Sequence, residues 1–235
     1  MLTIATKLYI YLLIADTCMG DKKMSRSKRI ILLANCVAVV VCGVIGLYLE
    51  QNLFQWKSLL FYTAISNIVA IVMCIVMAVK TATNKLNSKV WKIHFVVASM
   101  MAFTLGVVLL GAGLFTNNYG QYFWQNGDWA LHLVCPALVI INHLAFSPKH
   151  LTISWGIVPM VITTGYGIVM YILNGLSLVS GPYFFFDVQT IGIKAGMQYG
   201  IIMVMYCVGI TLAMYLPKRQ KQQYSSTKSA QIVQA

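Results

Sequence analysis

Two short groups of polar residues interrupt otherwise apolar stretches of the chain. Thr63, Ser66 and Asn67 stand at positions i, i+3 and i+4, which places their side chains on one face of a helix. Asp128 and His132 are four residues apart in a second stretch and also share a helix face. A hydroxyl and an imidazole are the minimum parts of a base-activated nucleophile, and a carboxylate can orient the imidazole. If the two stretches meet in the fold, these residue types favour acyl-transfer chemistry.

Six long apolar segments carry these residues. Each is close to the ~20 apolar residues that a helix needs to cross a bilayer core of ~30 Å. The chain is 59% hydrophobic and 9% charged, which excludes a soluble globular protein. The sequence therefore predicts an all-α polytopic membrane protein built as a six-transmembrane-helix bundle. The segments run over residues 30–49, 58–79, 95–115, 129–146, 153–173 and 198–216.

The 17 Lys and Arg residues predict the orientation of the bundle. They gather before the first segment, in every second gap and in the tail, whereas the gaps 50–57, 116–128 and 174–197 hold few of them. Because basic residues next to helix ends stay cytoplasmic, we expect both termini inside and the protein in the plasma membrane. Contact with anionic lipid explains the net charge of +12 better than a nucleic-acid partner does.

The sequence predicts one transmembrane domain over residues 24–217. Residues 1–23 are an N-terminal extension that reads either as a membrane-surface helix or as a segment upstream of a natural start at Met24. Residues 218–235 are rich in Gln, Ser and Lys without apolar periodicity, which predicts a disordered cytoplasmic tail. The six cysteines contain no C-x-x-C pair, so they indicate neither a zinc site nor a disulfide framework, and we expect no cofactor.

The predicted orientation places the two polar groups at one depth. Thr63 lies about five residues into the second segment from its outer end, or ~7.5 Å, and His132 about four residues into the fourth, or ~6 Å. We therefore expect Thr63 and His132 at the same depth in the outer leaflet, in a polar site between the second and fourth segments, with Ser66 and Asn67 as candidate oxyanion donors. The supporting residues are Ser66, Asn67, Asp128 and Asp187.

Each of these residues also has a purely structural interpretation. A transmembrane threonine commonly bonds the carbonyl four residues before it or joins two helices. His132 is equally suited to an interhelical hydrogen bond, and Asp128 to capping the fourth helix. Pro136 is expected to kink that helix and to free backbone carbonyls beside the site.

Four motifs, in order along the chain, resemble a bacterial family of six-helix membrane proteins. They are Tyr62-Thr63-x-x-Ser66-Asn67, His132-x-x-x-Pro136, Phe146-Ser147-Pro148-Lys149 and Pro182-Tyr183-Phe184-x-Phe186-Asp187-Val188. More distantly, residues 30–216 resemble the androgen-induced and androgen-dependent-TFPI-regulating (ADTRP) proteins of animals, which are membrane threonine hydrolases of fatty acid esters of hydroxy fatty acids. The resemblance implies Thr63 as the nucleophile, His132 as the base and a fatty-acyl lipid ester as the substrate.

The expected function is hydrolysis of such an ester through an acyl-enzyme on Thr63. Four aromatic residues are expected to line the acyl groove: Trp129, Tyr183, Phe184 and Phe186.

Two alternatives stay open. A protein that binds or transports a small molecule or lipid would use the same polar residues without chemistry. A haem protein would use His94 and His143, which lie toward the cytoplasmic ends of the third and fourth segments and are placed to face each other.

Overall fold

The structure, a computed structural model, describes residues 24–54, 60–110, 127–147, 153–179, 188–194, 196–212 and 214. Within these ranges the chain is helical apart from short turns and connections, and it contains no strand. Five helices are long and apolar enough to cross a membrane. The predicted all-α, multi-pass class is therefore confirmed at this level. The elements are α2 (Arg26–Phe54), α3 (Tyr62–Ala82), α4 (Ser88–Leu110), η3 (Trp129–Val134), α6 (Cys135–Phe146), α7 (Ile153–Gly175), α8 (Val188–Ile191) and the shorter apolar helix Gly196–Leu212.

The starts of α3 and α4 differ from the starts that the apolar runs predict. α4 begins at Ser88, well before the predicted start, because Asn87 Oδ1 accepts the Val90 N–H at 3.1 Å and caps the helix inside the basic turn. α3 begins at Tyr62, later than predicted, so Thr63 stands in the first turn of α3. Thr63 is therefore the second residue of α3, whereas the predicted segment placed it about five residues from the start.

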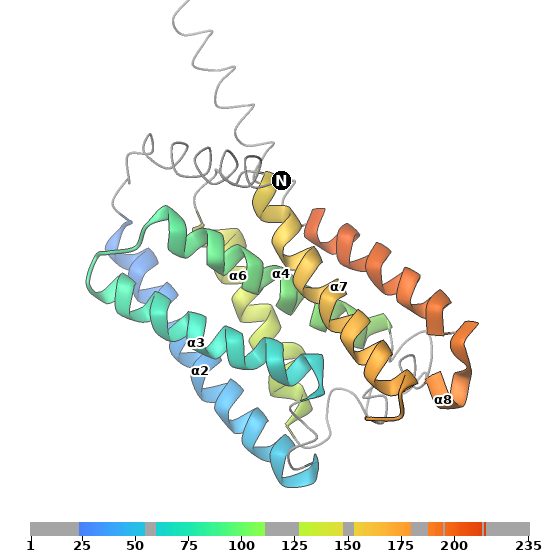
Figure 1. Cartoon of the computed structure of the whole chain (residues 1–235). Helices are drawn as coiled ribbons and strands as arrows, with labels where there is room; N and C mark the ends of the chain where they lie inside the picture. The colour runs from blue at the N-terminus through green and yellow to red at the C-terminus, as the bar shows by residue number, and fades with distance from the viewer. Residues whose placement is uncertain are drawn as a thin grey trace, which may run out of the picture.

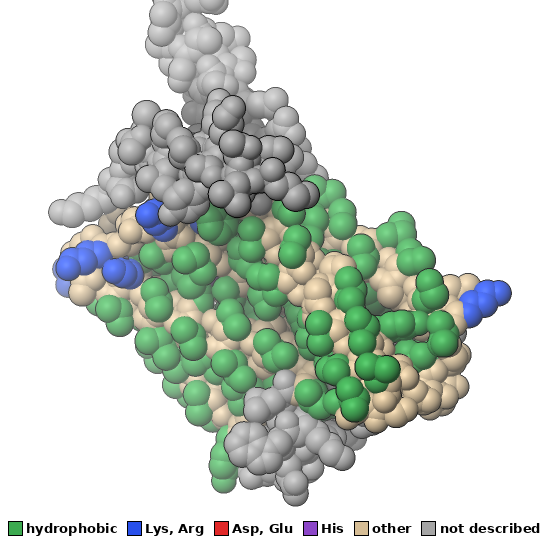
Figure 2. All heavy atoms as spheres, viewed as in Figure 1, with side chains coloured by type: hydrophobic (Ala, Val, Ile, Leu, Met, Phe, Trp, Pro, Cys, Tyr) green, Lys and Arg blue, Asp and Glu red, His purple; other side chains and the backbone are tan. Residues whose placement is uncertain are grey.

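α4 is the central helix of the bundle. Inside the protein, 72% of its apolar window is buried, against 17% for α7. α3 and α6 pack on α4, α7 packs on it from the other side, and α2 lies against α3 and α6 (Figure 1). The visible outer face is covered with hydrophobic side chains, while Lys and Arg stand at its edges (Figure 2). Such a surface suits contact with lipid.

The two ends of the bundle differ in charge. At one end, which we call the basic end, the Arg29 guanidinium donates to the carbonyls of Thr81 at 3.2 Å and Ala82 at 3.4 Å, and so joins the start of α2 to the end of α3. The opposite end, the acidic end, holds Glu50 and Asp128, the two carboxylates among the described residues. The site that the sequence predicts lies at the acidic end.

Two glycines allow α2 to approach the start of η3 closely at the acidic end. A Cβ added to Gly127 would lie 2.5 Å from the carbonyl oxygen of Gly46, which is backbone and has no freedom to move aside. A Cβ added to Gly46 would meet the Leu131 side chain at 2.8 Å. This close packing sets the position of η3 relative to α2.

The Gly127→Ala variant should be destabilised by about 1–3 kcal/mol, because the added methyl forces α2 and η3 apart. Gly165→Ala is the matched control, since a Cβ at Gly165 in α7 meets nothing within 4 Å. The control should be neutral or gain up to about 1 kcal/mol of helix propensity. Unfolding midpoints of the two variants in detergent test this, and equal midpoints would contradict the close contact.

Candidate functional site

Pro136 shapes the helix that carries His132. Residues Trp129–Val134 form a π-helix, and the N–H of Cys135 donates to the carbonyl of Ala130, five residues back. Leu131 would accept from Cys135 in an α-helix or from residue 136 in a π-helix, but Pro136 has no N–H. The Leu131 carbonyl is therefore left without a partner within its own helix, as the sequence predicted for carbonyls beside Pro136.

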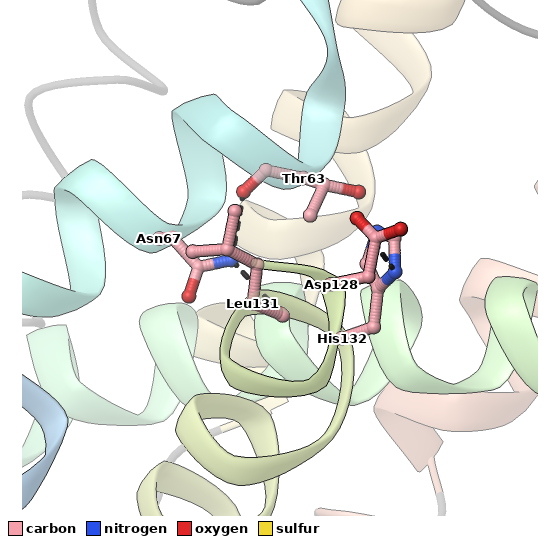
Figure 3. Close-up of polar contacts among 5 residues, drawn as sticks. All are labelled: Thr63, Asn67, Asp128, Leu131 and His132. Atoms are coloured by element: carbon pink, nitrogen blue, oxygen red, sulfur yellow. Dashed lines mark hydrogen bonds and ion pairs between the residues drawn. The ribbon is translucent and has the colours of Figure 1, made fainter. Parts of the chain in front are cut away.

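Asn67 of α3 supplies the donor that the Leu131 carbonyl lacks within its own helix. Its Nδ2 donates to the Leu131 carbonyl at 3.0 Å and to the Thr63 carbonyl at 2.8 Å, so both amide protons are used. Asn67 is fully buried. A single side chain thus joins the backbone turn of Thr63 to the residue next to His132 (Figure 3).

Ser66 strengthens the same arrangement from the α4 side. Its Oγ donates to the Thr63 carbonyl at 3.0 Å and lies 3.0 Å from Thr104 Oγ1 on α4. Thr63, Ser66 and Asn67 share one buried face of α3, as their spacing predicted. Because the protons of Ser66 and Asn67 go to backbone carbonyls, these two residues position Thr63 rather than offer donors to a ligand.

His132 and Asp128 lie side by side at the start of η3 and form an ion pair when the imidazole is protonated. Asp128 Oδ1 lies 3.8 Å from His132 Nδ1, and the two side chains are 27% and 14% exposed. Burial raises the pKa of the Asp128 carboxyl to about 6, so Asp128 gains its negative charge as pH rises through that value. Asp128 makes no side-chain capping hydrogen bond. Asp128 therefore acts on His132 through its charge, from the side of Nδ1.

The Thr63 hydroxyl points to the side on which Asp128 and His132 lie, away from Asn67 (Figure 3). Thr63 is 4% exposed and belongs to α3, whereas Asp128 and His132 belong to the first turns at the start of η3. The structure therefore gathers a hydroxyl, an imidazole and a carboxylate at the acidic end, held by the bond between Asn67 and Leu131.

Thr63 also lines an apolar cavity of about 420 Å³ between α3, α4, α7 and the helix Gly196–Leu212. Two tyrosine hydroxyls on its wall are bonded to protein: Tyr62 to Thr163 Oγ1 at 2.7 Å, and Tyr166 to the Leu60 carbonyl at 2.6 Å. The volume is within the range of small-molecule sites. Such walls suit a hydrocarbon chain, with Thr63 at the border between the cavity and η3.

Of the four aromatic residues predicted to line the acyl groove, the structure describes one. Trp129 is partly buried at the first position of η3, outside the lining of the cavity. Four further predictions lie outside the described residues: Tyr183, Phe184, Phe186 and Asp187. The expected termini, residues 1–23 and 218–235, lie outside them as well.

The prediction that His94 and His143 face each other is confirmed. Both are fully buried near the basic end, and their rings stack at a centroid distance of 5.7 Å and an interplanar angle of 20°. A ring nitrogen coordinates metal in the plane of its ring, so two rings stacked face to face do not direct their lone pairs at one ion between them. This packing does not favour the haem alternative.

A scan against protein-family models finds no match to the chain, and searches of curated proteins and of solved structures find none either.

Two features of the site were not predicted from the sequence. One is the π-helix, for which Pro136 is a partial signal in the sequence, because it prevents an ordinary hydrogen-bond ladder around His132. The cavity is formed by residues from four helices that are distant in sequence, such as Phe103 and Met203. No local pattern encodes such a meeting, because helix rotation is set by packing.

A double-mutant cycle of Asn67→Ala and Pro136→Ala tests the origin of the bond between α3 and η3. Asn67→Ala alone should cost about 1–3 kcal/mol, because the Leu131 carbonyl is then buried without a donor. In the Pro136→Ala background the new N–H competes for the freed carbonyls, so the loss of Asn67 should cost less. We expect a coupling of at least about 0.5 kcal/mol in unfolding measurements. Additive effects would contradict this account.

Proposed function

We propose that the protein is a membrane-embedded hydrolase of lipid esters, with Thr63 as the nucleophile and His132 as the general base. The observation that carries this proposal is the position of Thr63. Thr63 lines an apolar cavity, and its hydroxyl is directed to the side on which the His132–Asp128 pair lies (Figure 3). An acyl chain in the cavity would bring its ester carbonyl to the hydroxyl that the imidazole can deprotonate.

In the proposed reaction, His132 Nε2 takes the proton of Thr63 Oγ as Oγ bonds to the ester carbonyl carbon. The carbonyl π electrons move to oxygen and return as the bond to the alcohol breaks, and His132 gives its proton to the departing alcohol. Water then attacks the acyl-Thr63 ester while His132 takes its proton, and His132 returns this proton to Thr63 Oγ as the acyl–Oγ bond breaks and the fatty acid leaves. The negative charge of Asp128 stabilises the imidazolium that forms in both steps.

The developing oxyanion needs donors other than Ser66 and Asn67. α3 begins at Tyr62, and the first backbone bond at its start is the Ile65 N–H to the Phe61 carbonyl at 3.2 Å. The positive end of the helix dipole therefore lies at Thr63. We assign oxyanion stabilisation to this helix terminus, which a nucleophile five residues inside the helix would not reach.

We propose further that the protein lies in the plasma membrane, crosses it six times and has both termini in the cytoplasm. The sixth span is the helix Gly196–Leu212, which is apolar but shorter than the other five. Support for the orientation comes from the basic end, where Arg29, Lys80 and Lys85 lie at helix ends. The site would then lie in the outer leaflet, where lipid substrates enter laterally.

The cavity also favours a second candidate function. An apolar space in which the Tyr62 and Tyr166 hydroxyls are bonded to protein would hold a lipid chain without any chemistry, as a lipid-binding or transport protein requires. The two functions differ in what they need from Thr63. A hydrolase loses turnover with Thr63→Ala, whereas a binding protein changes only its affinity.

Labelling of the purified protein with a fluorophosphonate probe tests the nucleophile. Thr63→Ala should abolish labelling, because the attacking oxygen is gone, and His132→Ala should slow it by about 10²–10⁴-fold. Thr164→Ala is the matched control, since Thr164 also lines the cavity, and it should label like the wild type. Wild-type labelling of folded Thr63→Ala would exclude Thr63 as the nucleophile.

Gly200→Leu tests the cavity as the acyl site. A Cβ at Gly200 meets nothing within 4 Å, so the leucine should fill the cavity without disturbing its wall. Selectivity for long over short acyl esters should fall by about tenfold or more, because the long chain loses its space. Gly165→Leu places the same side chain outside the cavity lining and should keep the wild-type selectivity. Unchanged selectivity in both variants would locate the acyl chain elsewhere.

A further inference from the structure

One stripe of α2 packs along the helix that carries His132. Its residues follow heptad spacing, and the contacts run in antiparallel order. Cys135 Sγ donates to the Val39 carbonyl at 3.6 Å, and Gly46 lies against Leu131 and Gly127. The stripe consists of Cys36, Val39, Gly43, Gly46 and Glu50.

Glu50 is the last member of this stripe, one turn beyond Gly46 toward the acidic end. Because Gly46 touches Gly127, that turn brings Glu50 to the neighbourhood of Asp128, and the two carboxyl groups lie within electrostatic range of each other. Glu50 is 8% exposed, and its Oε2 is buried without a hydrogen-bond partner among the described residues. A carboxylate in such surroundings is unfavourable, and a second one beside it is more so.

Few other charges face this pair. Among the described residues, η3 contributes His132 and α3 contributes the uncharged Tyr62, whose hydroxyl bonds Thr163. Tyr48 of α2 is 65% exposed, and α4 and α6 carry their charged and imidazole groups at the basic end. His132 is the cationic partner for which the structure records a contact with one of the two carboxyls.

We propose that Glu50 is a positioning residue that holds a proton shared with Asp128, so that the pair presents one negative charge to His132 rather than two. The more buried Glu50 carries the proton, and the more exposed Asp128 carries the charge. One carboxylate stabilises the imidazolium that forms during proton transfer. Two would hold the proton on His132 and leave it unable to act as a base.

The chemistry of the pair follows from its surroundings. As pH rises, Asp128 loses its proton first, since burial raises its pKa only to about 6. Its charge then opposes ionisation of Glu50, so the pair titrates in two coupled steps. The part of this inference that concerns His132 rests on the proposed hydrolase function, whereas the shared proton does not.

Infrared spectroscopy of the purified protein, titrated from about pH 5 to 9, tests the shared proton, because an exposed carboxyl has already ionised near pH 4. The chain has only five acidic residues, so the carbonyl band of a protonated carboxyl can be assigned by single substitutions. Wild type should lose this band in two steps, and Glu50→Gln should keep only the lower step. Asp128→Asn should leave one step, moved to lower pH because the neighbouring charge is gone.

Three results would each overturn the proposal. Wild type could show no upper step, Glu50→Gln could still show the upper step, or the step in Asp128→Asn could stay at the same pH. Glu50→Gln imitates the protonated side chain and should fold normally.

The labelling assay tests the effect on His132. The labelling rate of wild type should fall above the pH of the upper step, while that of Glu50→Gln should not. Parallel pH profiles of the two labelling rates would overturn the effect on His132. If Thr63 is not labelled at any pH, the proposed function fails, but the infrared result still decides whether the carboxyls share a proton.

Discussion

The site depends on one backbone carbonyl that its own helix does not satisfy. Pro136 removes the N–H that would bond Leu131 in a π-helical register, and Cys135 donates to Ala130 instead. In an apolar bundle an unpaired carbonyl is costly, so the neighbouring helix must supply a donor. Asn67 supplies it, and the same amide holds the Thr63 carbonyl. A local defect in one helix therefore becomes the link that positions two candidate reactive residues.

The rest of the acidic end is arranged around this link. Gly46 and Gly127 allow α2 to lie directly against the start of η3, and Glu50 follows one turn later beside Asp128. On the other side of Thr63, the cavity extends between α3, α4 and α7. The polar groups thus lie between a tight interface and an apolar space. This arrangement keeps charge near His132 and leaves room for a hydrocarbon chain near Thr63.

Residue spacing in the sequence predicted which side chains share a helix face better than it predicted where the helices begin and how they pack. The shared face of Thr63, Ser66 and Asn67 follows from helical periodicity alone, and the facing of His94 and His143 follows from their matching depth. The first turn of α3 was misplaced because the helix begins at Tyr62, after the apolar run has started. The cavity and the neighbourhood of Glu50 depend on how helices rotate against one another, which local periodicity does not encode. The heptad spacing of Gly43, Gly46 and Glu50 is a signal that points to Glu50 once η3 is known to be the partner of α2.

The most direct test of this account is whether residues 63 and 132 are neighbours in the membrane. Thr63→Cys combined with His132→Cys, oxidised in native membranes and analysed by mass spectrometry of the linked peptides, measures this. The account predicts a disulfide between positions 63 and 132. It predicts none when Thr63→Cys is combined with Leu133→Cys, because Leu133 is 36% exposed on the outer side of η3. Equal linkage of both pairs, or linkage of the second pair alone, would contradict the geometry on which the proposed chemistry rests.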